Sequence, residues 1–222
     1  MASVVRHCLA SDWPADLVAV TGDLIQDDSA AAYQRFIELI GPLGLPVHCI
    51  PGNHDIRDFM RTAVSAPPFY YCDATEIENW LIVGVDSCEP GGAGGAIDAG
   101  EYQRLDEAIE SSDAEHVMVC LHHPPVKMGS AWLDTVGLDE PENFFERIAA
   151  SGKVRLAIFG HVHQEYDSEH HGVQIIGTPS TCAQFKPGSD DFAVDDRPPA
   201  YRRITLHADG QFDTELLWVG DA

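Results

Sequence analysis

Hydrophobic residues along the chain gather in short runs of strand length, and amphipathic segments of helical length separate several of these runs. The predicted strands cover residues 16–22, 46–50, 69–73, 80–86, 116–121, 154–160, 172–177, 200–207 and 211–219. We interpret 69–73 and 80–86 as a pair of neighbouring strands. Because many runs are continuously apolar, we expect these strands to be buried on both faces, with helices covering the sheet.

Helices are predicted over residues 29–41, 100–112 and 141–152. Ser29 is a suitable N-cap and Gly41 a suitable stop for the first, while Pro141 and Gly152 bound the third. Strands and helices alternate through the first two thirds of the chain, and the last third contains strands alone. The pattern predicts one α/β domain over residues 1–222, without a linker or an internal repeat.

Two segments have the composition of loops. Residues 89–100 are rich in glycine but lack the GxGxxG order, so we interpret them as a flexible loop rather than a phosphate-binding one. Residues 184–200 contain turn-forming residues throughout and are expected to wrap around the surface.

Charge restricts the possible partners. The 222 residues include 13 Lys and Arg against 36 Asp and Glu, which gives a net charge of −23. A negative protein is repelled by nucleic acids and by anionic membrane surfaces, so neither is expected as a partner.

The six cysteines form no CxxC pair, and Cys49, Cys88 and Cys120 lie in or beside apolar strands. This usage is typical of core residues in a reducing compartment. Neither a signal peptide nor an apolar run of about 20 residues is visible, so we expect a cytoplasmic protein.

Several strands are followed by residues that can bind a metal ion. These are Asp23, then Asn53, His54 and Asp55, then His122 and His123, and finally His161 and His163. Taken singly, Asp23 could cap a helix, Asn53 could support a turn, and a lone His is more often structural. Their occurrence after four strands favours a metal centre, since the carboxyl ends of strands in α/β sheets form sites.

The residue types indicate which chemistry this centre performs. Imidazole combined with carboxylate and amide oxygens, without thiolates, is typical of a hydrolytic metal site. A carboxylate such as Asp23 can bridge two ions, and ions ~3.5–4 Å apart can stabilise an in-line displacement at phosphorus. Asn53 would bind through its amide oxygen, and His54 would face the substrate as a hydrogen-bond donor or general acid.

These motifs together resemble those of the calcineurin-like metallophosphoesterases. The matching motifs are GD at 22–23, GNHD at 52–55, HHPP at 122–125 and GHVH at 160–163, and they occur in the same order as in that family. The stretches TGDLIQD (21–27), GSAWLD (129–134) and GTPSTCAQFKPGSDDF (177–192) are similar to bacterial class III 3′,5′-cyclic AMP phosphodiesterases of the Icc type.

The resemblance implies a double-sheet sandwich with α-β-β-α layers and two divalent metal ions, iron or manganese, although the same ligands accept zinc. Asp23 would bridge the ions. Asn53, His122 and His161 would complete one site, and His163 would belong to the other.

The resemblance also implies a reaction on a small cyclic nucleotide. A metal-bound hydroxide would attack phosphorus and open 3′,5′-cyclic AMP to 5′-AMP, with His54 assisting the leaving oxygen. Asp23, Asn53, His54 and His163 would surround the phosphate. Of the two adjacent histidines, the resemblance implies that His122 is the metal ligand and that His123 lies beside the ligands without binding the metal.

One family motif is absent. No Asp-x-His precedes Gly22, so we expect the first strand of the sandwich to be missing and the domain to be N-terminally truncated. One metal site would then lack two ligands, and the chain would bind one ion well and the second weakly. Two alternatives therefore stay open: a broader metallophosphoesterase that acts on other phosphodiesters or phosphomonoesters, and a weakly active or inactive fragment.

Overall fold

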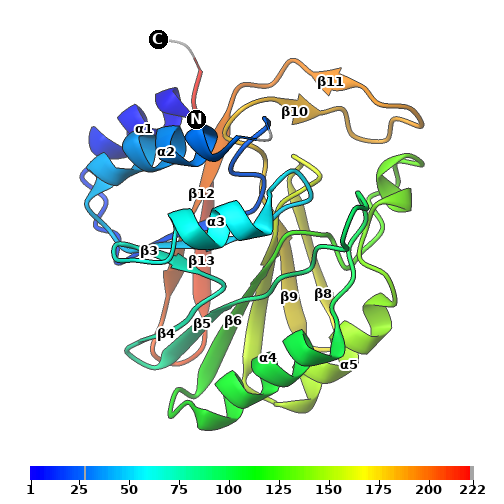
Figure 1. Cartoon of the computed structure of the whole chain (residues 1–222). Coiled ribbons are helices and arrows are strands. Elements are labelled where there is room, and N and C mark those ends of the chain that lie inside the picture. The colour runs from blue at the N-terminus through cyan, green and yellow to red at the C-terminus, as the bar shows by residue number, and fades with distance from the viewer. Residues whose placement is uncertain (28, 221–222) are drawn as a thin grey trace.

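Two β-sheets pack together between helices in the computed structural model, which describes residues 1–27 and 29–220 (Figure 1). The helices are α1 (Ala2–Leu9), α2 (Ala30–Ile40), α3 (Arg57–Ala63), α4 (Ala99–Ser111) and α5 (Pro141–Ala150). Short 3₁₀ turns follow α2 and precede α5, namely η1 (Gly41–Leu43) and η2 (Leu133–Thr135).

The first sheet has the order β1-β2-β3, with parallel strands β1 (Val18–Thr21), β2 (Val47–Ile50) and β3 (Phe69–Tyr71). The second has the order β4-β5-β6-β7-β9-β8. Its strands are β4 (Ala74–Ile77), β5 (Trp80–Gly84), β6 (His116–Leu121), β7 (Val154–Phe159), β8 (Tyr166–His170) and β9 (Val173–Gly177). Its four inner strands are parallel, and β4 and β8 run antiparallel at the edges. Two hairpins follow, β10 (Gln184–Phe185) with β11 (Val194–Asp195), and β12 (Ala200–Leu206) with β13 (Phe212–Trp218).

The two faces of the second sheet are buried in different hydrophobic clusters, because successive residues of a strand point to opposite sides. In β6, Val117 and Val119 belong to the cluster that includes residues of α4 and α5. Met118 and Cys120 belong instead to a cluster shared with Ile50 of the first sheet. A further cluster joins the first sheet to α1, α2 and α3. The expected α-β-β-α sandwich is therefore confirmed.

The three predicted helices form close to their expected bounds, and the first two carry side-chain caps. The Ser29 hydroxyl accepts a hydrogen bond from the backbone N–H of Ala32 at 3.2 Å, and Gly41 lies at the C-cap. The Asp98 carboxylate caps α4 in the same way, accepting from the N–H of Glu101 at 2.8 Å.

The predicted pairing of 69–73 with 80–86 is wrong. β3 pairs with β2 in the first sheet, and the antiparallel partner of β5 is β4, which the hydrophobic pattern did not indicate. β4 is half-buried to exposed at a sheet edge and so lacks the apolar run of a central strand. For the same reason the pattern missed β8, whose residues alternate between half-buried and exposed.

β1 occupies one edge of the first sheet in the described chain. All four of its residues are half-buried, whereas the four residues of β2 are buried. The β12–β13 hairpin packs against the cluster between the sheets through Ile204, Leu206 and Phe212 but pairs with neither sheet. Among residues 1–27 and 29–220, no strand therefore pairs with the outer side of β1.

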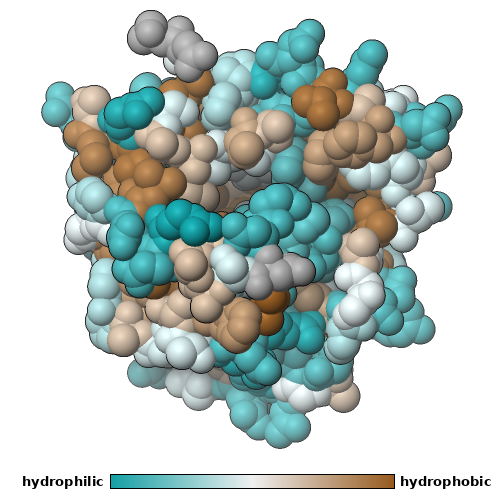
Figure 2. Space-filling model, turned by 45° about the horizontal axis from the view of Figure 1, so that its top comes forward, coloured by the Kyte–Doolittle hydropathy of each residue, from teal (hydrophilic) through white to brown (hydrophobic). Residues whose placement is uncertain are grey.

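The surface agrees with the composition. Figure 2 shows a largely hydrophilic face on which hydrophobic residues form separate patches. As expected, Cys49, Cys88 and Cys120 are buried, and all six cysteines of the described chain are unpaired. Within residues 1–27 and 29–220, none of the helices has the length and apolar character that a bilayer span requires.

Candidate metal centre

Four loops that leave strands of both sheets meet at one place. Asp23 follows β1, Asn53 follows β2, His122 follows β6 and His161 follows β7. These strands belong to two different sheets, and their carboxyl ends lie together.

The donor atoms of these four residues lie close together. His122 Nε2 is 3.4 Å from Asp23 Oδ2, 3.3 Å from Asn53 Oδ1 and 3.1 Å from His161 Nδ1. Ligand atoms bound ~2.0–2.2 Å from one ion at bond angles of about 90–110° are separated by roughly 3.0–3.5 Å. Each of these three distances from His122 Nε2 therefore matches the separation of two ligands of one cation. The three side chains of the described residues whose donor atoms all lie within 4.8 Å of one another are His122, His123 and His161.

The hydrogen bonds of His122 and His163 involve Nδ1 and leave Nε2 of each ring available to a metal ion. His122 Nδ1 lies 2.7 Å from the carbonyl oxygen of Thr21 and His163 Nδ1 lies 2.8 Å from that of Ala183, so both Nδ1 atoms carry the proton. In the neutral form of each ring, Nε2 is then the unprotonated atom, which a metal ion requires.

The electrostatics of the site favour a bound positive charge. Burial opposes ionisation of Asp23, but the imidazole of His122 and the backbone N–H of His54 outweigh it and hold the pKa of this carboxyl far below its usual value. Burial also opposes protonation of His122, yet the Asp23 carboxylate raises its pKa. Burial and the neighbouring imidazoles keep the pKa of His161 well below its usual value, so that ring stays neutral and able to bind a metal.

A family model described as calcineurin-like phosphoesterase matches residues 2–165 of the chain. The chain belongs to the calcineurin-like phosphoesterase family.

Proteins named as cyclic AMP phosphodiesterases are similar to most of the chain. A protein from Pseudomonas aeruginosa named 3′,5′-cyclic adenosine monophosphate phosphodiesterase CpdA is 37% identical over 206 residues, which cover 93% of this chain and 75% of that protein. The proteins of the same name from Haemophilus influenzae and Escherichia coli are each 35% identical, over 222 and 207 residues. These alignments cover 100% and 93% of this chain and 81% and 75% of the relatives.

Solved structures of low sequence identity share the calcineurin-like phosphoesterase fold. A Thermus thermophilus protein, TT1561, has a TM-score of 0.61 at 16% identity and covers 96% of this chain and 91% of its own. A dimetal phosphatase from Danio rerio has the same TM-score and identity, covering 99% of this chain and 89% of its own. At this identity the likeness supports the fold alone.

The glycines of this phosphoesterase's GD and GN motifs are required by close approach. A Cβ on Gly22 would lie 2.2 Å from His122 Nδ1, and one on Gly52 would lie 2.1 Å from Asp23 Oδ1. Asp23, His161 and His163 themselves have φ values of 54°, 60° and 52°, in the left-handed region. Such strain is found where surrounding contacts fix the backbone for function.

Asp55 links two of the ligand loops, a role that the sequence analysis did not assign. Its Oδ2 accepts hydrogen bonds from the N–H of Gly52 at 2.9 Å and of Leu24 at 3.2 Å, and the Tyr33 hydroxyl donates to its Oδ1 at 3.1 Å. Burial raises the pKa of Asp55. The residue holds the loops of Asp23 and Asn53 at a fixed separation.

Ser87 and His123 support the His122 loop. The Ser87 hydroxyl accepts from the N–H groups of His122 and His123 at 3.2 and 3.1 Å, and lies 3.0 Å from His123 Nδ1. The rings of His122, His123 and His161 form a triangle with centroid separations of 4.8–4.9 Å. Burial lowers the pKa of His123 to about 3, so the buried ring is neutral.

The two remaining predicted residues lie at the open side of the centre. His54 is exposed, its N–H donates to Asp23 Oδ1 at 3.0 Å, and its Nδ1 lies 3.2 Å from the Gln26 amide nitrogen. Burial lowers the pKa of His163, whose ring stacks on Phe185 with a centroid distance of 4.2 Å.

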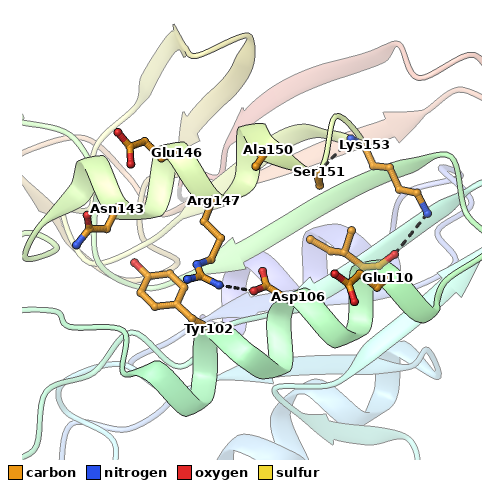
Figure 3. Close-up of a pocket in the computed structure, with 10 residues that line it drawn as sticks. Tyr102, Asp106, Glu110, Asn143, Glu146, Arg147, Ala150, Ser151 and Lys153 are labelled. Carbon is orange, nitrogen blue, oxygen red and sulfur yellow. Dashed lines mark hydrogen bonds and ion pairs between the residues drawn. The ribbon is translucent and has the colours of Figure 1, made fainter.

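Two hollows differ in their relation to these residues. One of about 290 Å³ lies beside Asn53 and is also lined by Arg57, Glu89, Gly91 and Gly92. A larger one of about 800 Å³ lies between α4 and α5 and contains none of the candidate ligands. Figure 3 shows its Arg147–Asp106 ion pair. The larger hollow is separate from the metal centre.

We expect Asp55→Ala to lower the free energy of unfolding by about 2–4 kcal/mol, because the N–H groups of Leu24 and Gly52 and the Tyr33 hydroxyl lose their buried acceptor. Metal affinity should fall as well. Urea unfolding and metal titration would measure both effects, with the exposed Asp58→Ala as the control. Unchanged stability and metal affinity in the Asp55 variant would contradict the linking role.

Proposed function

We propose that this chain is a phosphodiesterase that uses divalent cations to hydrolyse 3′,5′-cyclic AMP to 5′-AMP. The observation that carries the proposal is the convergence of donor atoms from Asp23, Asn53, His122 and His161. The similarity to proteins named CpdA from three bacteria supports the choice of substrate.

In this proposal Asn53, His122 and His161 would hold one cation together with Asp23, and Asp23 and His163 would hold a second. The donor set suits iron, manganese or zinc. When bound, the cations supply positive charge for the phosphate and lower the pKa of a water molecule. Of the described residues we assign only Asp23 and His163 to the second cation, and we infer that it binds more weakly than the first.

His54 is the proposed proton donor. The Gln26 side-chain amide lies 3.2 Å from His54 Nδ1, so Nε2 is the nitrogen left to face the substrate. To act as the proton donor the ring would be in its imidazolium form and would be left neutral after the transfer. Asp23, Asn53, His54 and His163 surround the phosphate. A water molecule would lose a proton to solvent as its oxygen bonds to phosphorus. The P–O3′ bond breaks, and the His54 imidazolium gives a proton to O3′, so that the phosphate stays on O5′.

The setting of the enzyme is also a proposal. We infer that residues 1–222 act as one catalytic domain in the cytoplasm, on a small cyclic nucleotide. The net charge of −23 disfavours nucleic acids and anionic membranes as partners.

The function is tested with a substrate panel of cyclic AMP, cyclic GMP, a 2′,3′-cyclic nucleotide, a chromogenic diester and a phosphomonoester, using metal-loaded protein. We expect the highest kcat/KM with cyclic AMP and 5′-AMP as its product. Equal values throughout would favour a broader phosphoesterase. Absence of turnover on every compound would reject the enzyme function.

We expect His54→Ala to lower kcat strongly, by about 10²–10⁴-fold, because general acid catalysis contributes this much. Stability and metal content should change little, since the His54 side chain is exposed. Steady-state kinetics, thermal unfolding and metal analysis on the same preparation would show this. A variant with wild-type kcat would exclude His54 as the proton donor.

For metal content we expect about one tightly bound ion per chain after dialysis and a second that binds only at higher free metal concentration. Asp23→Ala should abolish both, because this carboxylate is shared between them. Elemental analysis and calorimetric titration would measure the two stoichiometries, with Asp58→Ala as the control. Wild-type metal content in the Asp23 variant would contradict the proposed ligand set.

A further inference from the structure

Two stretches that the metal centre does not use come together in the structure. Trp132 belongs to the GSAWLD stretch, and Phe185 and Phe192 belong to the GTPSTCAQFKPGSDDF stretch. Their ring centroids lie 5.1 Å apart for Trp132–Phe185, 5.4 Å for Trp132–Phe192 and 5.5 Å for Phe185–Phe192. We refer to these three side chains as the aromatic platform.

The platform adjoins the metal centre directly. The His163 ring stacks on Phe185 at a centroid distance of 4.2 Å and an interplanar angle of 8°. His163 Nδ1 also donates a hydrogen bond to the carbonyl oxygen of Ala183, two residues before Phe185. These two contacts hold the platform against His163, the residue that we propose to contact the phosphate.

The outer part of the platform faces solvent. Phe192 is 64% exposed, the highest value among the large exposed hydrophobic residues of the described chain. Trp132 and Phe185 are half-buried and pack against the cluster over the second sheet, whereas Phe192 lies in the loop between β10 and β11 and belongs to none of the three core clusters. Trp132 and Phe185 thus hold the site in place, and the Phe192 ring is available to a ligand.

We propose that the aromatic platform binds the adenine of cyclic AMP by stacking on Phe192. The inference rests on the proposed function and extends it to substrate recognition. In cyclic AMP only the ribose separates the base from the phosphate, so a base-binding surface must lie next to the metal centre, as the platform does. Every nucleobase has a flat face that stacks on aromatic side chains.

The charges around Phe192 favour a small ligand over an anionic surface. Asp190 and Asp191 precede it directly in the hairpin loop, and the whole chain is strongly acidic. These carboxylates repel lipid headgroups and polynucleotide backbones. They do not prevent a neutral base from stacking, because the single phosphate of the nucleotide would lie at the metal centre.

The test compares cyclic AMP with methyl riboside 3′,5′-cyclic phosphate, which has the same cyclic ester and no base. Metal-loaded wild type should prefer cyclic AMP. In Phe192→Ala we expect kcat/KM for cyclic AMP to fall by about tenfold, through KM, as expected for the loss of one base-stacking contact. The base-free ester should react unchanged. Phe192→Trp should restore the preference, and Phe59→Ala, an exposed phenylalanine outside the platform, should have no effect.

The outcomes separate this inference from the proposed function. Equal losses on both esters, or none on either, would overturn the platform while leaving the phosphodiesterase function intact. If wild type hydrolyses neither ester, the proposed function fails. Calorimetric titration of metal-loaded wild type and Phe192→Ala with 5′-AMP then decides the platform: weaker binding by the variant supports it, and equal or undetectable binding by both rejects it.

Discussion

The contact between Asp23 and His122 joins the two sheets at the point where the site forms. Asp23 leaves β1 of the first sheet and His122 leaves β6 of the second, and their side-chain atoms lie 3.4 Å apart. The other nitrogen of His122 donates to the Thr21 carbonyl at the end of β1. The sandwich must therefore bring these strand ends together before any metal ion can bind between them. The hydrophobic cluster shared by the two sheets provides that constraint, since burial of its apolar surface fixes their spacing.

Holding the ligands in place requires unfavourable local conformations. Asp23, His161 and His163 all lie in the left-handed region, which costs free energy for a residue with a side chain. The compensation comes from neighbouring hydrogen bonds: Asp55 accepts from the backbone of two ligand loops, and Ser87 accepts from the backbone of another. These buried acceptors leave the loops little freedom, so the donor atoms are already positioned before a cation arrives.

The sequence predicted what depends on local pattern. The apolar runs located the central strands, Ser29 and Gly41 located α2, and the polar residues after the strands include side chains that the structure brings together. What it missed depends on contacts between distant segments. β4 was missed because an edge strand has no apolar run, and the error placed β3 in the wrong pair.

Long-range contacts also explain the parts of the site that the sequence did not reveal. Ser87 lies 35 residues from His122 along the chain, and Tyr33 lies 22 residues from Asp55. The aromatic platform joins residues from two separate stretches, and each stretch alone reads only as a loop. The spacing of such residues along the chain does not indicate that they are in contact. The family resemblance therefore drew attention to the GSAWLD and GTPSTCAQFKPGSDDF stretches but did not give them a role.

Electrostatics determine what this site can attract. The protein carries a net charge of −23, and Asp23 is ionised within the centre itself, so a phosphodiester anion meets a negative surface. Three of the imidazoles do not offset this, because burial lowers the pKa of His123, His161 and His163 and keeps these rings neutral. A bound divalent cation reverses the local sign at the point where the donors meet. A neutral imidazole does not attract phosphate, but it is the form that binds a metal ion. The neutral state of these rings therefore allows a cation to bind, and the bound cation in turn attracts the phosphate.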